Sequence, residues 1–209
     1  MSMQREETVT CPYCGKTVEC TMWQSINTEK ESAVTDIISG RLFETVCESC
    51  GKILHLDYPI LFNDLEHQVM IDYVPQEKVR EAVRASDLMH SMGGRVRIVT
   101  DQTSLREKVA VFDAGLDDRI VEILKLLAVS RIADQLKGRP VENVYFVPDE
   151  ENPSLEIHAG GESFSLGVNM EGYANLEERF REKLPDTDMD MFIGPNWALN
   201  FLHAFREDG

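Results

Sequence analysis

The amino-acid sequence predicts an α+β protein, and three patterns of residues lead to that class. Two Cys-x-x-Cys-Gly turns, Cys11–Gly15 and Cys47–Gly51, mark a small module near the beginning of the chain. Residues 118–137 have the apolar periodicity of a buried helix, and Gly160-Gly161 separates two strand-like segments. We therefore expect two modules of different architecture.

The paired turns predict a closed metal site. Two thiolates separated by two residues can bind one ion from a tight turn, and the glycine that follows permits a positive φ angle. Together the turns supply four soft ligands, Cys11, Cys14, Cys47 and Cys50. Four cysteines fit a structural Zn²⁺ ion, with iron, as bound in rubredoxins, as the alternative. Because four protein ligands fill the coordination shell, the metal has no position for a reacting water.

The position of the turns also predicts the domain organisation. Residues 1–75 should form a zinc ribbon with rubredoxin-like knuckles and a helix inserted between them. Residues 76–209 should form an α/β module that packs on the ribbon and contains a central buried helix and a β-hairpin.

Strands are expected on both sides of the knuckles. Cys20 and its apolar neighbours two residues away alternate with polar residues, which predicts a half-buried strand leaving the first knuckle. We interpret Cys20 as a core residue rather than a redox thiol. Further strands are expected over residues 42–47 and 52–58. His55 is interpreted as a surface or packing residue, since four cysteines already complete the metal shell.

Helix signals occur between the knuckles and again after residue 74, on either side of an apolar segment. Thr28–Glu31 is a capping box, and the apolar spacing after it predicts a helix that ends at Gly40. Residues 58–73 are rich in aromatic and aliphatic side chains and are interpreted as a short buried segment crossing between the modules. Pro75 then suits the start of a helix that extends to about Met92.

The second module should be organised around one long helix. A strand is expected over residues 95–99, and a capping box at Ser104–Glu107 opens a helix that reaches about Phe112. Asp117 can cap the next helix, over residues 118–137. Because apolar residues cover most of its circumference, this helix should form the core of the module.

A two-residue turn at Gly160-Gly161 fixes the register of the expected hairpin. The expected pairs are Ala159 with Glu162, Ile157 with Phe164 and Leu155 with Leu166. His158 then pairs with Ser163 on the opposite, exposed face, where we interpret the two as a polar pair rather than a catalytic one.

Two helices are expected near the end of the chain, over residues 175–183 and from Pro195. The second carries an aromatic stripe, Trp197, Phe201 and Phe205, at i+4 spacing. We interpret the stripe as core packing, with a partner-binding face as the alternative. Asp186–Asp190 resembles a calcium loop but lacks the required glycine and glutamate further along, so calcium is rejected.

The chain is acidic, with 21 Lys and Arg against 37 Asp and Glu and a net charge of −16. Such a surface repels polyanions, and binding to phosphates needs clustered basic residues. The best candidates for a basic face are Arg119, Lys125, Arg131, Lys137 and Arg139. Charged residues interrupt the most apolar stretch, Ile120–Ala133, and Met1–Glu7 has no secretory signal pattern. Cysteines concentrated in knuckles fit a reducing compartment better than a disulfide framework.

The sequence around the cysteines has a family resemblance. CPYCG, CESCG, Trp23–Asn27 and Tyr58–Asp64 resemble the CpXC domain family, and Arg97–Val99 and Leu105–Val109 are similar to it as well. Glu48 stands where the family has a proline that only stiffens the second knuckle. The resemblance implies a cytoplasmic prokaryotic protein with a four-cysteine site, from a family whose role is uncharacterised.

The sequence contains no phosphate-binding glycine loop, no metalloprotease helix motif and no serine nucleophile elbow. We therefore expect a zinc-binding adaptor or regulatory protein that binds a protein partner or self-associates, and that binds neither nucleic acid nor membrane. The first alternative is an enzyme with an unrecognised site in the C-terminal module. The second is a nucleic-acid-binding zinc ribbon.

Overall fold

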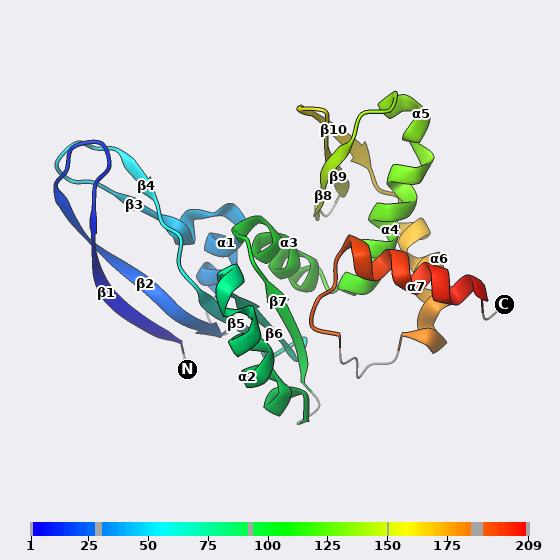
Figure 1. The fold of residues 1–209 in the computed structure, drawn as a ribbon, viewed down its shortest axis with the longest axis horizontal. Coiled ribbons are helices and arrows are strands. Elements are labelled where there is room, and N and C mark those ends of the chain that lie inside the picture. The colour runs from blue at the N-terminus through cyan, green and yellow to red at the C-terminus, as the bar shows by residue number, and fades with distance from the viewer. Residues whose placement is uncertain (1, 28–30, 92–93, 150, 185–189, 208–209) are drawn as a thin grey trace. The chain divides into compact units, whose positions relative to one another are not determined.

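A computed structural model describes residues 2–27, 31–91, 94–149, 151–184 and 190–207 (Figure 1). The chain has a mixed α+β structure, as predicted, and divides into two compact units, Met1–Val109 and Ala110–Gly209. Helix α3 (Gln102–Asp113) contains the point of division.

The first unit is built on a five-stranded mixed sheet with the order β1-β2-β5-β6-β7. Its strands are β1 (Met3–Thr10), β2 (Thr17–Asn27), β5 (Ile60–Asp64), β6 (Val69–Tyr73) and β7 (Arg95–Val99). β1–β2 and β5–β6 are antiparallel hairpins, whereas β2 pairs in parallel with β5, and β6 with β7. The structure thus groups residues differently from the predicted boundary at residue 75, because β6 and β7 lie on either side of it in one sheet.

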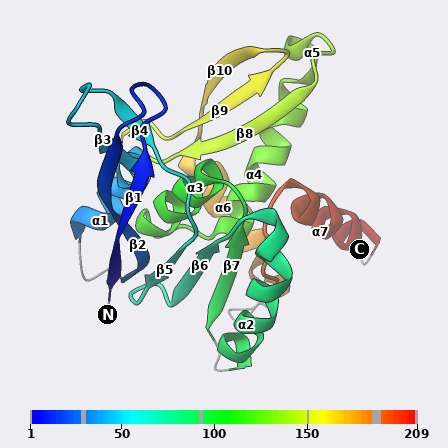
Figure 2. The ribbon, with the colours of Figure 1, turned by 60° about the vertical axis from the view of Figure 1, so that its left-hand side comes forward.

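Two hairpins carry the cysteine turns. The β1–β2 hairpin extends beyond the sheet, since β2 pairs with β5 only over Ser25–Asn27. The second hairpin, β3 (Glu44–Val46) with β4 (Ile53–His55), forms a separate two-stranded sheet. Figure 1 and Figure 2 show the connecting loops of the two hairpins at the same end of this unit. The fold therefore brings residues 11–16 and 47–52 together.

The helices of the first unit follow the sequence signals. Helices α1 (Glu31–Ser39) and α2 (Val79–Ser91) lie where helices were predicted, and short 3-10 turns, η1 (Arg41–Phe43) and η2 (Gln76–Lys78), precede β3 and α2. α1 ends at Gly40, whose φ of 84° is the left-handed conformation that favours glycine. Residues 28–30 of the predicted capping box, and Met92–Gly93 at the predicted end of α2, lie outside the described residues.

Two expectations for this unit are wrong. Residues 58–73 contain the β5–β6 hairpin rather than a segment crossing between modules. Asp64 builds its turn, because the Asp64 carboxylate accepts hydrogen bonds of 3.1 Å from the backbone N–H groups of Glu66 and His67. Asp101, not Ser104, caps α3: the Asp101 carboxylate accepts the Ser104 backbone N–H at 2.8 Å.

The base of the β3–β4 hairpin is anchored by aromatic side chains of the same unit. The buried Phe43 ring lies 5.1 Å from the Tyr58 ring and 6.1 Å from the Tyr73 ring, measured between centroids. The Tyr58 hydroxyl donates to the Leu42 carbonyl at 3.0 Å. These contacts fix the hairpin that carries the second cysteine turn.

The second unit packs helices against a three-stranded antiparallel sheet with the order β10-β9-β8. The strands are β8 (Val141–Val147), β9 (Ser154–Ala159) and β10 (Glu162–Gly167). The helices are α4 (Asp118–Arg131), α5 (Ala133–Leu136), α6 (Met170–Phe180), the 3-10 turn η3 (Arg181–Lys183) and α7 (Pro195–Glu207). The calcium-like residues Asp186–Met189 lie outside the described part of the chain.

Helix α4 lies in the core of this unit, as predicted, and packs there against the sheet. Ile120 and Ile123 of α4 belong to one buried cluster with Leu155 and Ile157 of β9. The hairpin register is the predicted one, with Ile157 opposite Phe164 and Leu155 opposite Leu166. The two-residue Gly160-Gly161 turn, with φ angles of 60° and 75°, produces this register.

Helix α4 is shorter and less buried than its apolar pattern indicates. The predicted helix over 118–137 breaks at Ile132, after which α5 forms a separate turn. Leu127 is 38% exposed and lines an apolar groove with Leu199 and Leu202 of α7. The prediction that α4 is buried all round is therefore wrong for its second half.

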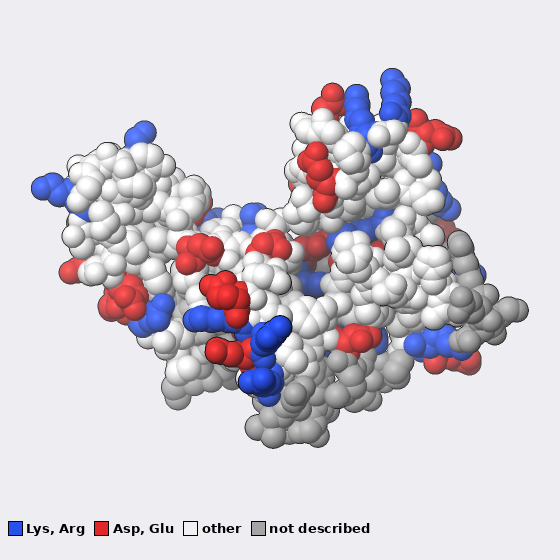
Figure 3. All heavy atoms as spheres, viewed as in Figure 1, with Lys and Arg blue, Asp and Glu red and all other residues white. Residues whose placement is uncertain are grey.

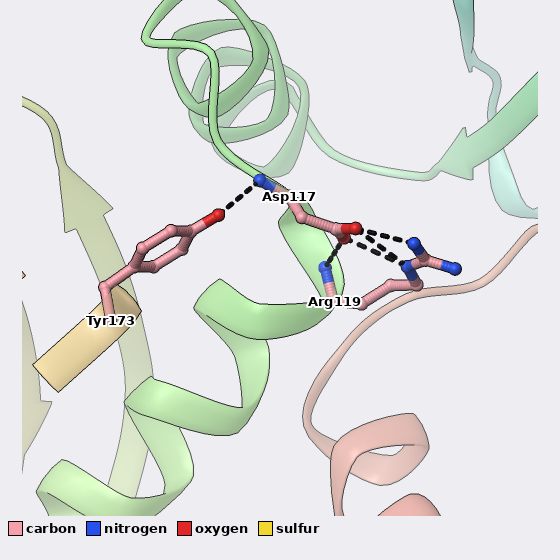
Figure 4. A network of polar contacts seen from close by, with 3 residues as sticks. All are labelled: Asp117, Arg119 and Tyr173. Atoms are coloured by element: carbon pink, nitrogen blue, oxygen red, sulfur yellow. Dashed lines mark hydrogen bonds and ion pairs between the residues drawn. The ribbon is translucent and has the colours of Figure 1, made fainter. Parts of the chain in front are cut away.

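The start of α4 is held by a network of polar contacts (Figure 4). The Asp117 carboxylate accepts the Arg119 backbone N–H at 2.9 Å, which confirms Asp117 as the helix cap. The same carboxylate pairs with the Arg119 guanidinium at 2.6 Å. The Asp117 backbone N–H donates to the Tyr173 hydroxyl of α6 at 2.8 Å.

The aromatic stripe of α7 packs inside this unit. Trp197 stacks on Phe201 with a centroid distance of 5.3 Å, and Phe180 of α6 meets Phe201 and Phe205 edge to face. The Arg179 guanidinium lies 5.4 Å above the Phe205 ring. These contacts confirm core packing for the stripe.

Candidate metal centre

Each cysteine pair lies on a tight turn of the same construction. In the first turn, the Cys11 backbone N–H donates to the Lys16 carbonyl at 2.8 Å, and the Gly15 N–H donates to the Cys11 carbonyl at 2.9 Å. In the second turn, the corresponding bonds join Cys47 to Lys52 at 2.9 Å and Gly51 to Cys47 at 2.7 Å. Both glycines have a φ of 70°. A Cβ atom at either position would meet nothing within 4 Å, so crowding does not require glycine there. The left-handed backbone conformation is what favours it.

The four sulfurs come together across the two turns. The Sγ atoms of Cys11 and Cys50 are 3.7 Å apart, and those of Cys14 and Cys47 are 3.6 Å apart. All four lie within 4.8 Å of one another. A tetrahedral ion with metal–sulfur bonds of about 2.3 Å places its sulfurs about 3.8 Å apart. The four cysteines are therefore positioned to hold one metal ion, and the sulfurs are too far apart for disulfides, whose S–S bonds are about 2.05 Å.

The cluster is buried on one side and open to solvent on the other. Cys11 and Cys47 are buried in a small apolar core with Val18 and Leu54. Cys14 and the fourth cysteine, Cys50, are exposed. The apolar side gives the hairpins a common packing surface, and the exposed side leaves the chain around the cluster available for contacts.

The crowded thiols affect one another's ionisation. Desolvation raises the pKa of Cys11, but hydrogen bonds from the Tyr13 and Cys14 backbone and from neighbouring thiols outweigh it and lower that pKa to about 7. At Cys14 a backbone hydrogen bond from Lys16 lowers the pKa, whereas desolvation and the neighbouring thiols raise it to about 12. One thiolate thus opposes the formation of the next. A divalent cation would offset this opposition, because its positive charge attracts all four thiolates.

The other candidate residues of the first unit lie outside the cluster. The His55 side chain is 75% exposed, and its Nδ1 atom lies 3.5 Å from a Glu44 carboxylate oxygen across the β3–β4 hairpin. Cys20 is buried in β2, where desolvation raises the pKa of its thiol. Both positions agree with the predicted surface histidine and core cysteine.

The two hairpin-borne turns and their converging sulfurs define a protein with a four-cysteine cluster built to hold a metal ion. A family model described as CpXC protein matches residues 9–125, which is more than half of the chain. The chain belongs to the CpXC family. Neither the curated proteins nor the solved structures contain a significant match to it.

The described helices give no candidate for a membrane span, because none combines sufficient length with sufficient apolar character. The predicted exclusion of a helical span over Ile120–Ala133 agrees with this finding.

Two groups of residues escaped the sequence analysis. Val46 and Ile53, which flank the second cysteine turn, pair across β3 and β4 with exposed side chains. Glu156 lies beside His158 on β9, and its carboxylate contacts the imidazole at 3.0 Å. The i, i+2 alternation of a strand, combined with the predicted hairpin register, was the signal that places Glu156 on the face of His158 and Ser163.

Proposed function

We propose that this protein holds one structural Zn²⁺ ion and acts as an adaptor or regulator that binds other proteins. The convergence of the Cys11, Cys14, Cys47 and Cys50 sulfurs within 4.8 Å is the observation that supports the metal most directly. Thiolate ligands suit zinc, and iron is the alternative ion. A Zn²⁺ ion with four thiolates has no open position, so its role is to order the two hairpin loops rather than to activate water.

Exposed apolar side chains beside the cluster support a role in protein binding. Tyr13, in the first turn, is 63% exposed, and the cross-strand pair Val46 and Ile53 is 55% and 49% exposed. Tyr13 precedes Cys14, and Val46 precedes Cys47. The sulfurs of these two cysteines are 3.6 Å apart, so their exposed neighbours belong to the same end of the unit. Apolar groups presented on metal-ordered loops suit contacts with another protein.

The charge distribution argues against a nucleic-acid partner. The knuckle turns contribute only Lys16 and Lys52 as basic residues, with Glu48 beside them, in a chain whose net charge is −16. Figure 3 shows a largely uncharged surface with isolated basic groups at the end of the unit where the hairpin loops lie. Phosphate binding draws its strength from several clustered Lys and Arg contacts. A protein partner, or self-association, fits this surface better.

The basic residues proposed as an alternative nucleic-acid face are largely engaged elsewhere. Arg119 and Lys125 are buried in ion pairs, with Asp117 at 2.6 Å and with Glu122 at 2.9 Å. Arg139 pairs with Glu162 at 2.9 Å. These pairings reduce the charge available for phosphates. Free cysteines in a metal cluster also fit a reducing compartment, so we propose a cytoplasmic location and no membrane association.

Affinity capture with matched variants tests the protein-binding role. The double variant Val46→Ser/Ile53→Ser removes the apolar pair while leaving the cysteines in place, and Leu199→Ser, in the second unit, is the control because Leu199 is also exposed. We expect a protein captured by the wild type and by the control to be lost from the double variant, or a self-associated species seen by light scattering to dissociate. Equal capture by all three proteins would contradict this role for the pair.

A gel-shift titration at physiological salt tests the partner class. We expect no binding to random DNA or RNA at sub-micromolar protein concentration, because the chain lacks a concentrated basic face. Sub-micromolar binding that weakens steeply with salt would overturn the choice of a protein partner. The remaining alternative, an enzyme with its site in the C-terminal module, has one specific observation in its favour: the contacts of Ser163 and Glu156 with His158.

A further inference from the structure

Three polar side chains form a connected line on the outer face of the β8–β10 sheet. The Ser163 hydroxyl oxygen lies 3.3 Å from His158 Nδ1, and His158 Nε2 lies 3.0 Å from a Glu156 carboxylate oxygen. Serine, imidazole and carboxylate thus follow one another in the order used by serine nucleophiles activated by a histidine base.

The sheet itself holds this arrangement in place. The Gly160-Gly161 turn fixes the register in which His158 lies opposite Ser163 across β9 and β10. Glu156 precedes His158 by two residues, so the two side chains lie on one face while Leu155 and Ile157 are buried on the other. The neighbouring Tyr145 ring of β8 meets the His158 ring edge to face, with 5.8 Å between centroids. The imidazole is therefore positioned by three strands.

We propose that Ser163 is a nucleophile that accepts acyl groups from ester substrates, with His158 as its general base and Glu156 as a positioning residue. When the Nε2–H group donates to Glu156, the Nδ1 lone pair faces the serine and can accept the hydroxyl proton. This activity belongs to the second unit and uses no residue of the cysteine cluster.

The proposed reaction is acyl transfer followed by hydrolysis. Ser163 Oγ attacks the ester carbonyl carbon, the new C–O bond forms, and the hydroxyl proton moves to His158 Nδ1. The ester C–O bond then breaks, and the leaving oxygen takes that proton from the imidazole. Water repeats the sequence on the acyl-serine, releasing the carboxylic acid and returning the proton to Ser163.

The surroundings select activated esters as the substrate class. The side chains of His158 and Glu156 are 34% and 49% exposed, so the reacting groups are open to solvent and to bulky substrates. The backbone N–H groups of the adjacent turn are engaged, since Gly160 donates to the Pro140 carbonyl and Gly161 to the Glu142 carboxylate, each at 3.2 Å. Neither is available to stabilise an oxyanion. Substrates with a good leaving group, such as aryl esters, depend least on that stabilisation.

Two experiments on the whole chain test the proposal. The first labels the protein with a fluorophosphonate probe and locates the labelled residue by mass spectrometry. The second measures hydrolysis of p-nitrophenyl acetate. We expect the probe on Ser163 of the wild type, no label at that peptide in Ser163→Ala, and a labelling rate lower by on the order of 100-fold in His158→Ala. Ser165→Ala is the matched control, because Ser165 lies on the same face two residues along β10, opposite Glu156 rather than His158. Its labelling should equal that of the wild type.

Glu156 has its own test. Glu156→Ala should lower the labelling rate of Ser163, and Glu156→Asp should restore part of it, because a carboxylate again faces the imidazole. Each variant changes a side chain at an exposed or half-exposed position. Its unfolding temperature should therefore match that of the wild type within a few degrees. An unlabelled Ser163 in the folded wild type, or labelling in His158→Ala at the wild-type rate, would overturn the proposal.

Discussion

The Asp117 backbone N–H donates a hydrogen bond of 2.8 Å to the Tyr173 hydroxyl, which joins the cap of α4 to α6 (Figure 4). The Asp117 carboxylate, which caps the helix, also binds the Arg119 side chain, so Asp117 contacts both Arg119 and Tyr173. Tyr173 is buried, so its hydroxyl depends on hydrogen-bond partners within the protein. The bond is therefore a structural element of the second unit.

Tyr173→Phe should destabilise the protein. The substitution keeps the ring but leaves the Asp117 N–H without its acceptor, which costs about 1–3 kcal/mol of the free energy of unfolding. Tyr13→Phe is the matched control, because Tyr13 is 63% exposed and its change should alter that free energy by about 0.5 kcal/mol or less. Denaturant unfolding compares the two; equal midpoints for both variants would contradict this role of the bond.

Ionisation of Tyr173 should lower the stability of the protein at alkaline pH. Burial raises the pKa of Tyr173 to about 12, whereas a tyrosine in the unfolded chain has a pKa of about 10. Because the folded pKa is the higher one, this contribution is fully present below pH 10 and is lost as the pH rises between these values. At pH 11 the loss is about 1 kcal/mol. Because Tyr58 and Tyr73 also have raised pKa values, Tyr173 is isolated by a difference. Between pH 9 and 11 the wild type should lose about 1 kcal/mol more stability than Tyr173→Phe.

The two halves of α4 should respond differently to substitution by aspartate. Ile123 is fully buried, so Ile123→Asp should destabilise the second unit by about 3 kcal/mol or more. Leu127 is 38% exposed, and an aspartate there can reach water, so Leu127→Asp should cost about 1 kcal/mol or less. Thermal unfolding distinguishes the two variants. A larger effect at Leu127 would mean that the second half of α4 is covered.

The sequence predicted some elements of the fold and missed others, for identifiable physical reasons. The β9–β10 register followed from Gly160-Gly161, because a two-residue turn allows only one pairing. The β5–β6 hairpin was missed because its turn uses the Asp64 carboxylate instead of glycine or proline, and because apolar residues on both faces hide the alternation of a strand. The break in α4 at Ile132 was hidden by an apolar pattern that continues beyond it.

The candidate metal site was predictable in its ligands and not in its geometry. The spacing of each Cys-x-x-Cys-Gly turn is local, so the sequence alone indicated the four cysteines. The pairing of Cys11 with Cys50 and of Cys14 with Cys47 depends on how two hairpins meet. The chain between them, with α1 and η1, decides that meeting through contacts that are distant in sequence.

Substitution of one ligand should release the metal and disorder the hairpin loops. Cys14→Ser leaves three thiolates, and metal binding in such small sites contributes roughly 10–16 kcal/mol of apparent folding free energy. Cys20→Ser is the control, since Cys20 is buried in β2 outside the cluster. We expect Cys14→Ser to lose the metal and to become sensitive to proteolysis near residues 11–16 and 47–52. Retention of a full equivalent of metal by Cys14→Ser would contradict the four-ligand site.

Acid should remove the metal from the same site. Protons compete with the ion for the four thiolates, so metal affinity falls as the pH is lowered, and metal binding releases protons. Titration of the loaded protein with a colorimetric zinc chelator should show release increasing from neutral to acidic pH. A release profile independent of pH would argue against thiolate ligands.

Elemental analysis of the purified full-length protein, together with its visible absorption spectrum, tests the central proposal most directly. The cluster of Cys11, Cys14, Cys47 and Cys50 sulfurs predicts one zinc ion per chain and a colourless protein. A protein that contains no metal after purification without chelators, or one that shows the red chromophore of an iron–thiolate centre, would contradict it.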